Sequence, residues 1–140
     1  MVKTGTVDSA GTDSKISVIL KDAKGSQVNI PNLVDYGKMG PGHDYFENGN
    51  LDTFKIETIC MESSVCSLTL TSDGTGPKPG WYVDYVQVLT NKAAVTTKGN
   101  SSTAAGDNIT FEIYGWLATD EPPYSLTRTF NKCGQSNAMI

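Results

Sequence analysis

Apolar and polar residues alternate in a series of short segments along the chain. Residues 15–20 place Ile16, Val18 and Leu20 on one face, and residues 67–71 do the same with Leu68 and Leu70. This period of two is typical of a strand that buries one of its faces. The same pattern predicts further strands over residues 26–30, 53–57, 81–89, 93–97 and 109–114.

Turn-forming residues separate these segments. Residues 72–80 and 98–107 are rich in Gly, Pro, Ser, Asn and Asp, and residues 36–42 predict a long irregular loop. Seven or eight short strands with such connections favour an all-β sandwich or barrel. The length of 140 residues suits one domain, expected over residues 1–134, with residues 135–140 as a frayed tail.

The composition argues against nucleic-acid binding and against a transmembrane helix. The chain has 11 Lys plus Arg against 15 Asp plus Glu, a net charge of −4, and no basic cluster that could neutralise a phosphate backbone. We therefore expect no nucleic-acid binding. Apolar residues make up 38% of the chain, but no stretch approaches the roughly 20 apolar residues that a transmembrane helix needs.

Few residues could carry enzyme chemistry. The chain has no phosphate-binding glycine fingerprint, no His-Glu-x-x-His motif and no calcium loop of the EF-hand type. Its single histidine, His43, lies in a glycine-rich loop where we expect it to be solvated, and a weak hydrolase built on it is one alternative. Three cysteines, Cys60, Cys66 and Cys133, are too few for a paired-cysteine zinc site. We expect that the protein is not an enzyme.

Two acidic loops are more informative. Residues 10–14 (AGTDS) and 42–52 (GHDYFENGNLD) each lie just before a predicted strand. Calcium takes six to eight oxygen ligands from carboxylates, amides and the main chain, and loops at the end of a sandwich can bring such groups together. Asp, Asn and Gly are also the residues that ordinary turns use, so both interpretations stay open.

Several segments resemble the PLAT domain, also called the lipoxygenase-homology domain. Residues 80–88 (GWYVDYVQV) resemble its Trp-containing strand. Its first loop and strand, second loop and closing strand are matched by residues 10–18 (AGTDSKISV), 46–54 (FENGNLDTF) and 111–117 (FEIYGWL). The small plant members known as PLAT-plant-stress proteins are matched further at residues 39–42 (MGPG), 65–74 (VCSLTLTSDG) and 116–120 (WLATD). The resemblance spans about residues 3–133.

This resemblance implies an eight-stranded antiparallel β-sandwich without an active site, which docks on lipids, membranes or a partner protein. Plant members of this kind respond to stress and enter the secretory pathway, so the endoplasmic reticulum or the extracellular space is the expected location. No signal peptide is evident at the start of this chain, and we expect an N-terminal piece to precede it. We expect Trp81, Val86 and Val88 to pack in the core, where they identify the fold rather than the function.

The resemblance also implies a calcium site, because calcium-binding PLAT domains take their ligands from these two loops. The corresponding groups here are the main-chain oxygens of Gly11 and Thr12 and the carboxylates of Asp13, Asp44 and Glu47.

Residues 36–45, which overlap the start of the second of these loops, carry Tyr36, Met39 and Tyr45, which we expect to be exposed and to contact the membrane. A protein–protein adaptor or a carbohydrate-binding sandwich without lipid affinity is the alternative.

The disulfide pattern of the family cannot be transferred whole, because two of its usual cysteines are missing from this chain. We predict a Cys60–Cys66 bridge across the short connection between two strands, which would leave Cys133 free.

Overall fold

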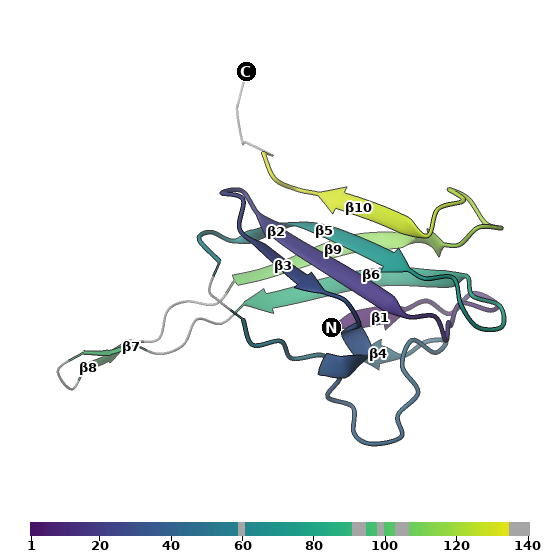
Figure 1. Cartoon of the computed structure of the whole chain (residues 1–140), viewed down its shortest axis with the longest axis horizontal. Coiled ribbons are helices and arrows are strands. Elements are labelled where there is room, and N and C mark those ends of the chain that lie inside the picture. Colours follow the sequence, from purple (N-terminus) through teal and green to yellow (C-terminus); the bar gives the residue numbers. More distant parts are fainter. Residues whose placement is uncertain (59–60, 91–94, 98–99, 103–106, 135–140) are drawn as a thin grey trace.

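The computed structural model describes residues 1–58, 61–90, 95–97, 100–102 and 107–134, and it is built from antiparallel strands (Figure 1). The elements are β1 (Val2–Thr4), β2 (Ile16–Asp22), β3 (Gln27–Ile30), the 3₁₀ turn η1 (Leu33–Tyr36), β4 (Leu51–Asp52), β5 (Val65–Ser72), β6 (Trp81–Thr90), β7 (Val95–Thr97), β8 (Asn100–Ser102), β9 (Asp107–Leu117) and β10 (Thr127–Asn131).

Eight of these strands form two four-stranded sheets. One sheet has the order β4-β1-β6-β9 and the other β10-β5-β2-β3, while β7 and β8 pair with each other. Every strand pair is antiparallel. The predicted eight-stranded antiparallel β-sandwich is therefore confirmed.

The core lies between the two sheets and contains the apolar positions that the alternation selects. The largest fully buried apolar side chains are Trp81, Phe46, Phe111, Ile16, Leu68, Leu70, Leu117 and Val83. Val86 is also buried and Val88 packs against the cluster, so their predicted core role is confirmed. The Trp81 indole N–H donates a 3.0 Å hydrogen bond to Thr4 Oγ1, and neither residue has accessible surface.

The predicted strand over residues 53–57 is wrong. Regular pairing ends with β4 at Asp52, and Phe54 forms only an isolated bridge with Gly37. The segment opposite is the irregular chain after η1, so hydrogen bonds from Lys38 N–H to Thr53 O and from Lys55 N–H to Tyr36 O replace a ladder. Phe54 still packs inward against the core.

Besides β4, which lies just before the wrongly predicted strand over residues 53–57, the sequence analysis missed the sandwich strands β1 and β10. β1 is only three residues long, yet it lies between β4 and β6 and buries Val2 and Thr4. β10 alternates exposed residues with half-buried Arg128 and Phe130, and it pairs with β5 along its whole length. Pairing with a neighbouring strand, rather than local hydrophobicity, defines both strands.

A disulfide joins Cys66 to Cys133, with their Cα atoms 4.9 Å apart. The register of β5 and β10 places Asn131 opposite Ser67, which brings the two cysteines together at the ends of these strands. The predicted Cys60–Cys66 bridge and free Cys133 are therefore wrong, because Cys66 already has a partner. Cys60 lies outside the described residues, as does the expected tail over residues 135–140.

Asp22 closes the turn between β2 and β3. Its carboxylate accepts hydrogen bonds from the backbone N–H groups of Lys24, Ser26 and Ser63, at 2.8–3.0 Å. Desolvation raises the pKa of this carboxyl, but the hydrogen bonds from Ser63, Ser26 and Lys24 outweigh it and hold the pKa below its ordinary value. Asp22 thereby ties the turn to the segment that precedes β5.

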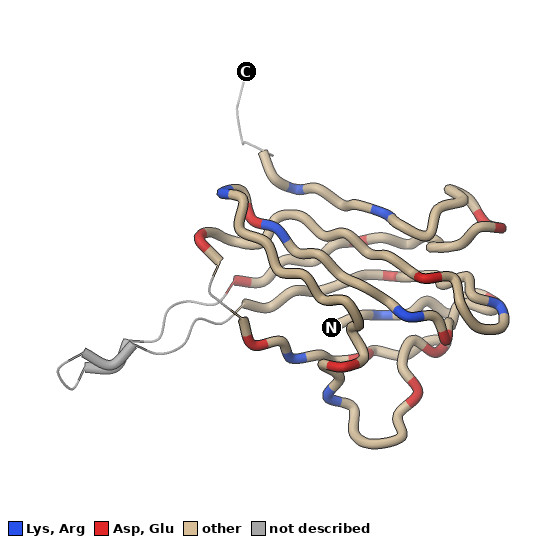
Figure 2. The backbone as a smooth tube through the Cα atoms, viewed as in Figure 1, with Lys and Arg blue, Asp and Glu red and all other residues tan. Residues whose placement is uncertain are grey.

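Charged residues of both signs are interspersed along the chain (Figure 2). This distribution agrees with the absence of a basic cluster in the sequence. In the part of the chain that the structure describes, no helix has the length and apolar character needed to cross a membrane.

Candidate metal centre

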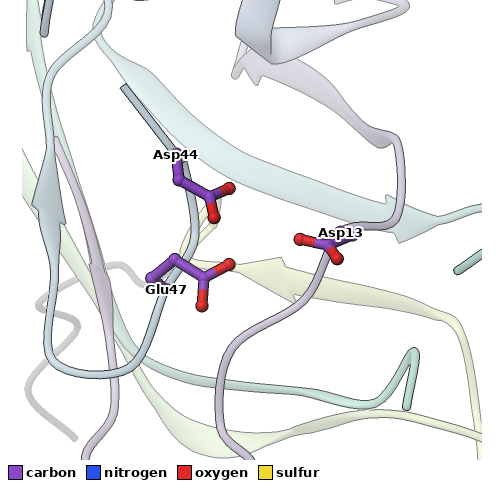
Figure 3. A group of neighbouring side chains, drawn as sticks. All are labelled: Asp13, Asp44 and Glu47. Atoms are coloured by element: carbon purple, nitrogen blue, oxygen red, sulfur yellow. The ribbon is translucent and has the colours of Figure 1, made fainter. Parts of the chain in front are cut away.

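Three carboxylates from two loops converge at one place on the sandwich. Asp13 comes from the β1–β2 connection, whereas Asp44 and Glu47 come from the loop between η1 and β4. One carboxylate oxygen from each residue lies within 4.8 Å of the other two. The three carboxylates face a common space (Figure 3). The structure thus brings together the three carboxylates that the sequence singled out.

Gly11 allows the two loops to approach each other closely. A Cβ atom at this position would lie 3.0 Å from Phe46 O and 3.1 Å from the Glu47 Cα. The next residue, Thr12, donates its backbone N–H to Phe46 O at 2.9 Å. A glycine followed by this hydrogen bond therefore fixes the distance between Asp13 and the acidic loop.

Gly11 and Thr12 line a hollow of about 220 Å³ together with Asp13, Glu47 and Lys78. The Thr12 hydroxyl is already engaged, since it donates to Pro79 O at 2.8 Å and accepts from Ser14 N–H at 3.1 Å. If Thr12 supplies a ligand to a cation, that ligand would therefore be its main-chain oxygen.

The three carboxylates repel one another. Partial burial and the negative charges of Asp44 and Asp13 raise the pKa of the Glu47 carboxyl above its ordinary value. The ion pairs found among the described residues, His43–Asp52 and Lys55–Glu57, involve none of the three. The site therefore concentrates negative charge, and the nearby cation is Lys78 on the lining of the same hollow, which forms no ion pair with the three carboxylates in the described part of the chain.

The donor chemistry fits a hard cation. Three carboxylates and nearby main-chain oxygens offer the ligand type that calcium takes, whereas zinc and copper favour sulfur and imidazole ligands. Asp13 and Asp44 are exposed and Glu47 is half-buried, so the oxygens can reach solvent. Calcium could thus enter without opening the core.

A buried carboxylate lies directly behind this loop. Asp52, with no accessible side-chain surface, accepts a hydrogen bond from Phe46 N–H at 2.8 Å, and its other oxygen lies 2.6 Å from His43 Nε2. The expectation of a solvated His43 is therefore wrong, because only 24% of its side chain is exposed. Among the described residues its side chain hydrogen-bonds to Asp52 alone, which lends nothing to a hydrolase.

The expected membrane loop is also less exposed than predicted. Tyr36 and Tyr45 are half-buried against the core, and only Met39 is exposed, at 38%. The Tyr45 ring lies 5.4 Å from that of Phe54, and its hydroxyl accepts a hydrogen bond from Met39 N–H at 3.1 Å. The two tyrosines therefore pack between this loop and the core instead of projecting into solvent.

A second hollow, of about 290 Å³, went unnoticed in the sequence analysis. It lies on the β6–β9 pair and is lined by Tyr85, Gln87, Thr110, Glu112 and Tyr114. A bulge in β9 opposite β6 puts Tyr114 in the left-handed region, at φ 42°, and leaves it 59% exposed. In the sequence, polar or aromatic residues alternate with Val86 and Val88. This pattern could have indicated the outer face of β6 on which the hollow lies.

Comparisons with known proteins agree with this architecture. A family model described as "Embryo-specific protein 3, (ATS3)" matches residues 1–104. PLAT domain-containing protein 1 of Arabidopsis thaliana is 44% identical over 133 residues, which cover 94% of this chain and 68% of that protein. PLAT domain-containing protein 3 of the same plant is 42% identical over 112 residues, covering 79% of this chain and the whole of that protein.

The solved structures support the fold. A coral 8R-lipoxygenase, described as calcium-activated through a C2-like domain, superposes with a TM-score of 0.65 at 23% identity. The match covers 93% of this chain but only 16% of the lipoxygenase, so it concerns one domain of that enzyme. From its sequence relatives and its sandwich, the chain belongs to the PLAT, or lipoxygenase-homology, domain family.

Proposed function

We propose that this chain is a non-catalytic PLAT module that docks on lipid surfaces with the assistance of calcium. The observation that carries the proposal is the convergence of Asp13, Asp44 and Glu47 from two loops. Like charges held this close destabilise the protein unless a cation offsets them. The calcium activation named for the coral lipoxygenase, whose C2-like domain shares this fold, supports the same chemistry.

Calcium would complete its shell from several sources. The three carboxylates supply anionic oxygens, and the main-chain oxygens of Gly11 and Thr12 are the proposed neutral ligands. Water or an oxygen of a lipid headgroup would fill the remaining positions of a six- to eight-coordinate shell.

Met39 is the proposed contact with the apolar part of the membrane. The net charge of −4 opposes the approach to an anionic bilayer, so a bound cation has to offset it locally. One inserted side chain contributes at most about 1.5–3 kcal/mol. Attachment by this loop is therefore weak and reversible.

The proposed location is the secretory pathway, and the proposed context is a plant stress response. The Cys66–Cys133 disulfide supports an oxidising compartment, because such bonds form and persist there rather than in the cytosol. The Arabidopsis PLAT relatives support a plant context.

Isothermal titration calorimetry with calcium tests the ion site. The parent chain is expected to bind calcium, and Glu47→Gln to lose most of that binding. Glu62→Gln is the matched control, since Glu62 is exposed and makes no ion pair with the described residues. Absence of heat for the parent, with no calcium-dependent change in Tm, would overturn the proposal.

A protein–protein adaptor or carbohydrate-binding module remains the second candidate. The hollow bounded by Tyr85 and Tyr114 favours it, because aromatic rings beside amide, hydroxyl and carboxylate groups suit a polar ligand. If the parent binds no vesicles but binds a saccharide or protein in a manner that Tyr114→Ala abolishes, this candidate replaces lipid docking.

A further inference from the structure

We propose that His43 and Asp52 are positioning residues that hold the acidic loop of residues 42–52 in the shape needed to bind calcium. Neither residue is a proposed ligand. The inference rests on the proposed calcium site and adds a requirement to it: the geometry of the ligands depends on the contact between half-buried His43 and buried Asp52 behind them.

Asp52 is committed to the inside of the loop. It lies at the end of β4 without accessible surface, and both of its oxygens face the chain that carries Asp44 and Glu47. One oxygen accepts the Phe46 N–H at 2.8 Å, and the other lies 2.6 Å from His43 Nε2. Since a carboxylate only accepts, the imidazole donates its Nε2–H in this contact.

These two contacts hold His43 and Phe46, which lie on either side of Asp44 and immediately before Glu47. Fixing residues 43 and 46 leaves the intervening loop little freedom to move Asp44. Asn50 adds two further restraints, because its side-chain N–H group donates to Asp44 O at 3.3 Å and its backbone N–H to Glu47 O at 3.0 Å. The ligand side chains thus project from a loop whose backbone is held at several points.

Phe46 connects this restraint to the loop that carries Asp13. Its φ of 62° lies in the left-handed region, an unusual conformation for a bulky residue, and its ring is buried 5.0 Å from that of Trp81. Its N–H is held by Asp52, and its carbonyl accepts the Thr12 N–H at 2.9 Å. Phe46 therefore links Asp52 by hydrogen bonds to both acidic loops, residues 42–52 and residues 10–14.

The pair works against the repulsion between the ligands. Three like charges favour any movement that separates the loops, so the calcium-free site keeps its shape only while the backbone resists that movement. Residues that orient metal ligands from behind typically change metal affinity by about 10- to 100-fold when substituted. We expect effects in this range from the loss of either partner.

The experiment measures the calcium dissociation constant of the parent, three variants and a control variant well below their melting temperatures, so that global unfolding does not contribute. The proteins are the parent, Asp52→Asn, His43→Leu and His43→Gln. Asp35→Asn is the matched control, since Asp35 is an exposed carboxylate on η1. Terbium luminescence reports occupancy of the site independently of heat.

The inference expects Asp52→Asn and His43→Leu to weaken calcium binding by at least tenfold, with His43→Gln restoring most of the affinity because its amide can donate to Asp52. His43→Leu leaves the Asp52–Phe46 hydrogen bond in place, so it remains informative if Asp52→Asn does not fold. Variants that melt earlier but bind calcium within twofold of the parent would overturn the positioning role. A parent that binds no calcium would instead overturn the proposed function.

Discussion

Removing one charge from the acidic cluster should change stability in opposite directions with and without calcium. In Glu47→Gln, the side chain keeps its length but no longer repels Asp13 and Asp44. We expect the calcium-free variant to be more stable than the calcium-free parent, whereas the parent should gain stability from calcium and the variant should not.

The size of the first effect follows from the separation of the carboxylates. At the 4.8 Å limit, two unit charges repel by about 0.9 kcal/mol in a water-like dielectric. A Debye length of about 8 Å at physiological salt roughly halves this value. Because Glu47 has two such neighbours, the calcium-free variant should gain about 1 kcal/mol, or about 4 °C in Tm for a domain of this size.

The second effect follows from mass action. Calcium at 100 times its dissociation constant stabilises a protein that binds it only when folded by about 2.7 kcal/mol. The parent should therefore overtake the variant at saturating calcium, and the two dependences of Tm on calcium should cross.

Differential scanning calorimetry in chelator and across a calcium series measures both effects, with Glu62→Gln as the control that should follow the parent. The reasoning is refuted if Glu47→Gln is less stable than the parent in chelator and retains the full response to calcium. That outcome would mean that Glu47 supports the fold rather than a cation site.

Three further predictions concern other parts of the sandwich. Thr4→Val leaves the buried Trp81 N–H without its partner and should destabilise the fold by about 1–3 kcal/mol in urea unfolding; an unchanged midpoint would contradict it. Because the folded pKa of Asp22 lies below its ordinary value of 3.8, its contribution to stability is present above pH 3.8 and lost as pH falls below it. As the pH falls from about 5 to about 2, Asp22→Asn should therefore lose less Tm than the parent, and parallel curves would argue against this. Met39→Asp should weaken calcium-dependent vesicle binding at unchanged Tm, because Met39 is an exposed loop residue, and binding equal to that of the parent would remove Met39 from the docking surface.

The sequence predicted the parts of the fold that depend on local pattern. Alternation around Leu68 and Leu70 and around Trp81 and Val83 identified strands that bury these residues. Turn composition together with family resemblance identified the two loops whose carboxylates meet. Both kinds of signal lie within a few neighbouring residues, which is why they can be read without a structure.

The features that escaped prediction depend on contacts between distant segments. β1 is a strand because β4 and β6 flank it. Cys66 forms a disulfide with Cys133 because the pairing of β5 with β10 brings them together. Tyr45 lies in a glycine-rich loop, yet it is half-buried because Phe54 and the core offer it a surface.

The His43–Asp52 contact follows the same rule. Nothing in the spacing of these residues indicates that the loop folds back so that a carboxylate of β4 meets the imidazole.

Vesicle co-sedimentation tests the central claim of calcium-assisted lipid docking most directly. The parent chain is mixed with phosphatidylcholine–phosphatidylserine vesicles in calcium or in chelator, with Glu47→Gln alongside it. We expect the parent to sediment with vesicles in calcium and to remain in the supernatant in chelator, while Glu47→Gln remains in the supernatant in both. A parent that sediments equally in calcium and chelator, or in neither, would contradict the claim.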